Sequence, residues 1–260
     1  MSSSTLAVVL ASAVRRGLSE RAHLVVRVAF YLVIIGVLSA LWGAAVRGHG
    51  GSIAGYTWAA FVWYFVASEG SVVGVEFRLI DVVGSAIGSG EIASDMLRPV
   101  SVLSFRASSD AGSALVRCAF MLAGGALFAL IVAGVPPSVP AALLAVPSAA
   151  LAVAVNVVSS YAFAGIAFWI EDSKVMWFLY QKLIFLVGGM LIPLQLLPGW
   201  LRAAAWFTPF WSMSYAPARL ASGHFEPWLL AGQAAWLGVA YALATAVFAR
   251  GERKLVVAGG

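Results

Sequence analysis

The sequence predicts an all-α membrane protein, in which six transmembrane helices form a single domain over residues 1–260. Two observations carry this prediction. First, 62% of the residues are hydrophobic and 10% are charged, with a mean hydropathy of +0.95; soluble domains are about 45–50% apolar and about 25% charged. Second, the apolar residues fall into runs that approach or exceed the ~20 residues needed to cross a bilayer as a helix. Lipid must therefore cover much of this surface.

The first predicted elements are an amphipathic helix and a membrane span. Residues 5–21 carry apolar side chains at helical spacing together with three arginines. This pattern favours a helix at the membrane interface, with an untethered N-terminal segment as the alternative. The first span is predicted at residues 24–46, where Arg27 lies near one end and can extend toward the interface. Because the run is longer than the ~7–15 apolar residues of a signal peptide, we expect it to be retained.

The middle of the chain contains three further predicted spans and one long polar stretch. The second span covers residues 56–75 and carries Glu69. Residues 76–110 are rich in glycine, serine and charge, so we expect a cytosolic loop there. The third and fourth spans, residues 114–135 and 141–170, are separated by a proline-rich turn.

The last third of the chain is interrupted by prolines. A fifth span is predicted at residues 175–192 and a sixth at residues 227–249. Residues 193–226 are apolar and aromatic but too broken by proline for a full span. We expect short helices there that re-enter the membrane from outside, packed against protein rather than lipid.

The distribution of basic residues predicts the orientation. With the N-terminus inside, the outer segments hold only Arg47, Arg202 and Arg219. The inner segments hold Arg15, Arg16, Arg21, Arg78, Arg98, Arg106, Lys174, Arg250, Arg253 and Lys254. This asymmetry follows the positive-inside rule, and both termini are therefore expected in the cytoplasm.

Several kinds of chemistry are absent from the sequence. Lys174, Lys182 and Lys254 are followed by Val, Leu and Leu, whereas a P-loop lysine precedes Ser or Thr. The chain has neither an H-E-x-x-H pair nor a G-x-S-x-G turn. Basic residues do not alternate with aromatics, which argues against nucleic acid. We expect no catalytic residue and no metal site in this chain.

Three polar residues within the predicted spans are candidates for a transport path. Lys182 lies about eight residues into the fifth span, roughly 12 Å deep at the helical rise. A charge at that depth indicates either a functional site or a structural pairing, for example with Glu69. Asn156 belongs to a stripe of small and polar residues at every fourth position, which favours helix packing over a substrate path.

The polar loop contains the most informative motif. Residues 90–99, Gly-Glu-Ile-Ala-Ser-Asp-Met-Leu-Arg-Pro, predict a short helix from Glu91 to Leu97, between a glycine and a proline. An ordinary solvated loop helix is the alternative. The run resembles the cytosolic loop between the second and third spans of ABC-2-type exporter permeases. Residues 168–172, 188–200 and 209–217 are also similar to that family, in the same order.

The resemblance covers nearly the whole chain and implies a mechanism. In the family, this loop docks onto the ATPase subunit, and two permeases, identical or paired with a sister subunit, carry two ATPases. ATP and Mg²⁺ would bind the ATPases, and this chain would bind no cofactor. The family implies a bacterial inner-membrane location. The coupling residues it implies here are Glu91, Ile92, Asp95, Met96, Leu97 and Arg98.

Two other functional classes remain open from the sequence. A secondary carrier or channel would use an ion gradient and need no ATPase. An intramembrane enzyme is disfavoured because the catalytic motifs are missing. The substrate is not readable, although the aromatic, apolar interior weakly favours an amphipathic or lipid-like molecule over a sugar or an ion.

Overall fold

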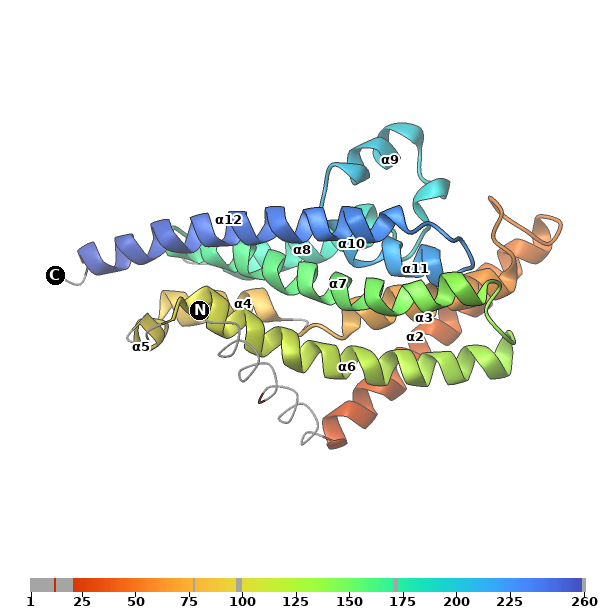
Figure 1. Ribbon diagram of the computed structural model, residues 1–260, viewed down its shortest axis with the longest axis horizontal. Helices are drawn as coiled ribbons and strands as arrows, with labels where there is room; N and C mark the ends of the chain where they lie inside the picture. Colours follow the sequence, from red (N-terminus) through yellow and green to blue (C-terminus); the bar gives the residue numbers. More distant parts are fainter. Residues whose placement is uncertain (1–11, 13–20, 77, 97–99, 171–172, 259–260) are drawn as a thin grey trace.

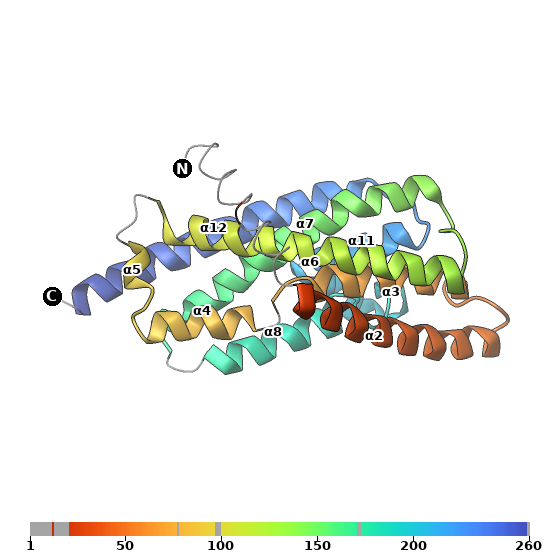
Figure 2. The same ribbon diagram turned by 90° about the horizontal axis from the view of Figure 1, so that it is seen from below.

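The computed structural model of the protein describes residues 12, 21–76, 78–96, 100–170 and 173–258. In this part of the chain the regular secondary structure is helical, apart from an isolated β-bridge between Ile53 and Tyr56. The long helices lie alongside one another in an elongated bundle (Figures 1 and 2). The amphipathic helix expected over residues 5–21 falls outside the described residues, except for Ser12 and Arg21.

The elements follow one another in a simple order. They are α2 (Arg21–Gly48), α3 (Trp58–Val73), α4 (Leu79–Gly88), α5 (Ala93–Met96), α6 (Val102–Val132), α7 (Val139–Ala164), η1 (Gly165–Phe168), α8 (Ser173–Val187), η2 (Leu194–Leu196), α9 (Gly199–Trp206), α10 (Phe210–Met213), α11 (Tyr215–Ala221) and α12 (Trp228–Ala258).

Four helical segments in the described residues are long and apolar enough to cross a membrane. They are His23–Gly48, Val102–Val132, Val139–Phe168 and Trp228–Lys254. The second and fifth expected spans correspond to α3 and α8, which are shorter than expected, at 16 and 15 residues. At the helical rise these cover about 22–24 Å, less than the ~30 Å hydrocarbon core. Helix α8 ends before Gly188, and Gly189 adopts a φ of 77°, a conformation that stops a helix.

Serine and threonine caps fix where several helices begin. The Thr57 side chain accepts a hydrogen bond from the Ala60 N–H at the start of α3, and Ser138 does the same for Ala141 at the start of α7. The Ser101 side chain likewise accepts from the Ser104 N–H, 3.3 Å away. Each cap satisfies a backbone donor that the first turn leaves unpaired.

The expected loop over residues 76–110 is largely helical, which corrects the sequence-based boundaries. Helix α6 begins at Val102 rather than near residue 114, because Ser101 caps it there. Helix α4 precedes it and buries Leu79, Ile80, Val83 and Ile87 on one face. Burial of that apolar face holds α4 against the bundle.

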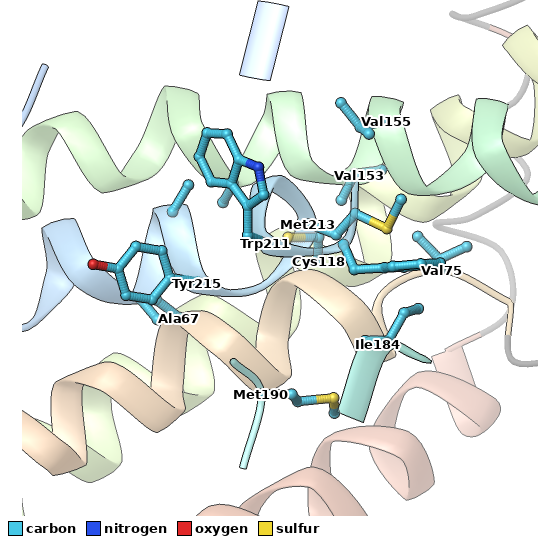
Figure 3. Packing of buried hydrophobic residues seen from close by; sticks show 14 of the residues in the cluster. Ala67, Val75, Cys118, Val153, Val155, Ile184, Met190, Trp211, Met213 and Tyr215 are labelled. Carbon is cyan, nitrogen blue, oxygen red and sulfur yellow. The ribbon is translucent and has the colours of Figure 1, made fainter. Parts of the chain in front are cut away.

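The region over residues 193–226 divides into a projecting part and a buried part. Helix α9 stands out from the bundle (Figure 1). Trp200 within it and Phe207 just after it are 75% and 84% exposed. Helices α10 and α11 instead pack within the bundle, where α11 contacts α7 and α3. Their residues Trp211, Met213 and Tyr215 belong to the central core (Figure 3).

A buried glutamine connects three helices of this core. Gln233 on α12 is fully buried, and its Nε2 donates to the Ser148 carbonyl of α7 at 2.9 Å and to the Ser212 carbonyl of α10 at 2.7 Å. The Ser148 hydroxyl donates back to Gln233 Oε1 at 2.8 Å. These bonds satisfy the side chain in an apolar setting and define how α7, α10 and α12 pack.

Candidate transport and coupling sites

A cavity of about 220 Å³ lies in the core between α2, α3, α4, α7 and α8. Its wall is mostly apolar and aromatic. Its apolar lining includes Val75 just after α3, Ile184 in α8 and Met190 just after α8. Figure 3 shows these three side chains in the core. Polar residues from three helices also line the cavity, namely Glu69, Asn156, Ser160 and Gln181, together with Glu76 just after α3.

Glu69 is the most deeply buried acidic residue of this cavity. It lies on α3 and is 1% exposed. Its Oε1 has no hydrogen-bond partner among the described residues. Burying a carboxyl group without a partner costs free energy, so such a group is a marker for a functional site.

The α7 and α8 side of the cavity carries amide and hydroxyl groups. The Tyr180 hydroxyl lies 2.8 Å from Asn156 Oδ1 and donates to it, which fixes the orientation of that amide. The neighbouring Gln181 has its Nε2 buried without a partner among the described residues. Asn156 therefore faces the cavity as well as packing α7 against α8.

Lys182 is not among the residues that line this cavity. It is exposed on α8, with its Nζ 4.9 Å from the ring centroid of Phe178 and 5.6 Å from that of Phe185. The suggested pairing with Glu69 is therefore wrong within this chain. Successive residues of a helix are rotated by about 100°, which places Gln181 at the cavity and Lys182 outside it.

Gln181 was the residue that sequence reasoning missed at this site. Gln181 and Lys182 are adjacent in the apolar α8, and the sequence favours the charged residue as the functional one because burying a charge costs more than burying an amide. The pattern alone does not say which of them faces the protein. The apolar face of α8 opposite Lys182 was the sequence feature that could indicate which side of this helix faces the protein.

The predicted coupling segment folds back onto its own bundle. Ile92 is 1% exposed and lies in the central core, so it offers no apolar anchor to a partner in this conformation. Its N–H bonds the Ala86 carbonyl of α4 at 3.1 Å, after a turn at Gly90 with a φ of 76°. The helix α5 begins at Ala93, two residues after the expected start at Glu91.

Asp95 and Glu91 differ in what they offer at the surface. Asp95 is 7% exposed, and its Oδ2 lies 2.5 Å from Arg106 Nε on α6. Glu91 is exposed, and its Oε1 lies 3.8 Å from the same guanidinium. Asp95 is thus held within the chain, whereas Glu91 remains accessible. Leu97, Arg98 and the side chain of Met96 lie outside the described part of the chain.

Arg106 is a second residue that sequence reasoning missed. Assigning residues 76–110 to a loop hid the fact that Arg106 and Asp110 are four residues apart on one face of α6. Asp110 Oδ2 accepts a hydrogen bond from the Tyr161 hydroxyl of α7 at 2.5 Å. The face of α6 that carries both residues therefore connects α5 to α7.

A second polar network lies near the opposite end of the bundle. Arg219 on α11 donates through Nε to Glu226 Oε1 at 3.0 Å and through its NH1 nitrogen to the Tyr56 hydroxyl at 2.8 Å. These bonds join α11 to the segments before α3 and α12. Partial burial and the nearby Arg219 charge lower the pKa of His224, which packs against Tyr56.

The described residues contain no group of three or more His, Cys, Asp or Glu side chains placed to hold a metal ion. Comparison with known proteins gives one result. A family model described as ABC-2 family transporter protein matches residues 32–259, a range that includes the coupling segment and every residue lining the cavity except Phe30. No curated protein matches the chain.

Proposed function

The chain belongs to the ABC-2 transporter family, and from this premise we propose that it is the permease subunit of an ATP-driven exporter. It works as a dimer, either with a second copy or with a sister permease. Two separate ATPase subunits bind ATP and Mg²⁺ and supply the energy. The chain itself is the membrane component and performs no covalent chemistry.

The position of α5 is the observation that best supports coupling to an ATPase. Helix α5 lies at the same end of the bundle as the C-terminal end of α12 (Figures 1 and 2). Arg106 holds it to α6, and Ile92 holds it to the core. Because α5 is fixed at both points, a movement of a bound protein would displace α6 and α7 together with α5, rather than displace α5 alone.

We also propose a six-span topology in the bacterial inner membrane, with both termini in the cytoplasm. The short helices α3 and α8 complete the set of spans. Helix α11 packs against α7 and α3, which supports a re-entrant region, because irregular backbone at membrane depth must lie against protein. The central cavity, with Glu69 and Asn156, forms part of the substrate path.

Purification of the tagged full-length chain from native membranes tests this function. We expect a soluble protein with Walker motifs to accompany it in stoichiometric amount, and the complex to hydrolyse ATP. A secondary carrier would instead purify alone and would respond to an ion gradient without nucleotide. That second outcome would replace the exporter assignment.

A further inference from the structure

Two buried polar atoms in the central cavity have no hydrogen-bond partner among the described residues. They are Glu69 Oε1 on α3 and Gln181 Nε2 on α8. Both residues line the same cavity, although they are far apart in the sequence. An acceptor and a donor left unsatisfied in an apolar setting each cost free energy. A molecule that satisfies both is therefore stabilised there.

We propose that this cavity binds an organic amine in its protonated form, with the ammonium donating to Glu69. A carboxylate only accepts hydrogen bonds and an ammonium only donates them, so the pair forms a charge-assisted contact. A hydroxyl, ether or carbonyl oxygen of the same molecule accepts from Gln181 Nε2. The inference rests on the proposed function and deepens it, because it names an amphipathic cation as the class of exported molecule.

The charges around the cavity favour a cation over an anion. The described lining contains no lysine or arginine but two carboxylates, Glu69 and Glu76. Glu76 Oε2 already lies 2.6 Å from a guanidinium nitrogen of Arg27, so Glu69 is the carboxylate left for a ligand. A bare metal ion would need several oxygen ligands in one shell, which this mostly apolar wall does not supply.

The size and composition of the cavity define the rest of the molecule. A dry apolar cavity of about 150 Å³ can hold a benzene ring, so the volume of about 220 Å³ here takes a ring or a short alkyl group together with the amine. Trp177, Ile184 and Phe185 offer the apolar and aromatic surface for that group. A sugar would leave most of its hydroxyls without partners against this wall.

The test uses the full-length chain in lipid nanodiscs without any ATPase. Calorimetric titration compares 2-phenoxyethylamine with 2-phenoxyethanol, which share the ring and an ether oxygen that can accept from Gln181 but differ in charge. We expect the amine to bind about tenfold more tightly or better, because only the amine forms a charge-assisted bond. Glu69→Gln should remove this preference and leave the alcohol affinity unchanged. Glu252→Gln makes the same change on α12, away from the cavity, and should keep the preference for the amine.

Two results would overturn the inference. One is that the wild-type chain binds the amine and the alcohol with equal affinity, or does not bind the amine at all. This result is obtained with the wild-type chain alone. The other is an equal loss of both ligands in Glu69→Gln, which would indicate a structural role for the carboxyl. Neither result depends on whether an ATPase associates with the chain. Failure of this inference can therefore be distinguished from failure of the proposed function.

Discussion

Arg106 and Asp95 form the contact that fixes the coupling segment: Arg106 Nε on α6 lies 2.5 Å from Asp95 Oδ2 on α5. Both side chains are largely buried. A short charge-assisted bond in such a setting has a well-defined geometry. This contact therefore determines how α5 is presented to a partner.

Replacing Arg106 by Gln should weaken coupling more than it weakens the fold. The variant loses the charged bond to Asp95 and about 1–3 kcal/mol of local stability. Substrate-stimulated ATP hydrolysis in the reconstituted complex should fall, while the detergent-solubilised chain stays monodisperse. Arg78→Gln is the matched control, because Arg78 pairs with Asp81 from an exposed position. Equal stimulation in the Arg106 variant and the wild type would exclude this contact as a coupling element.

Gln233 should be a stability residue with little part in transport. Gln233→Leu removes both bonds to the Ser148 and Ser212 carbonyls, and leaving these acceptors buried costs about 1–3 kcal/mol. Thermal unfolding in nanodiscs should show a lower Tm. Thr245→Val, at an exposed position of α12, should leave the Tm unchanged. A wild-type Tm for Gln233→Leu would contradict the role assigned to these bonds.

His224 predicts a pH dependence of stability. Burial, and after it the positive charge of Arg219, lower its pKa below 6.5 in the folded chain. The unfolded chain therefore binds the proton first as the pH falls. Stability from this group is complete above about pH 6.5 and decreases below it, through the folded-state pKa.

The measurement is the Tm between about pH 8 and pH 5, around the range in which histidine titrates. The wild type should lose stability over the acidic half of this range, and His224→Gln should lose less. The difference between the two curves isolates His224 from the carboxylates, which titrate in both proteins. Parallel curves would show that His224 does not carry the effect.

Single cysteines test the proposed topology, because Cys118 is the only native thiol. In a Cys118→Ser background, cysteines at the exposed positions Ser52, Val135 and Ala203 should react with an impermeant reagent from outside. Cysteines at the exposed positions Ser94 and Arg253 should react only from inside. Labelling of Ser94 from outside would overturn the orientation.

The helical class and most helices were predictable, because hydrophobicity and proline act locally. Helix α4 was not, since Asp81 and Ser85 gave its segment the composition of a loop. The spacing of Leu79, Val83 and Ile87 was the signal of an amphipathic helix. Over residues 76–110 the composition is therefore that of a loop, whereas the periodicity is that of a helix.

The candidate site was harder to predict than the fold. Glu69 and Asn156 do face one cavity, but which side of α8 faces it depends on packing with α4 and α7. For this reason the sequence alone favours Lys182 over Gln181 as a residue of the site. The burial of Ile92 likewise depends on α5 folding back onto the core, a contact that no local pattern in the sequence specifies.

Retention of an ATPase on the coupling segment tests the account most directly. Met96→Ala with Leu97→Ala truncates two apolar side chains, and loss of a central interface anchor costs about 2 kcal/mol or more. Leu127→Ala with Leu130→Ala, at exposed positions of α6, is the matched control. We predict that the wild type and the control retain a Walker-motif ATPase on affinity purification, and that the Met96 and Leu97 variant retains about tenfold less. Full retention by that variant, or none by the wild type, would contradict the account.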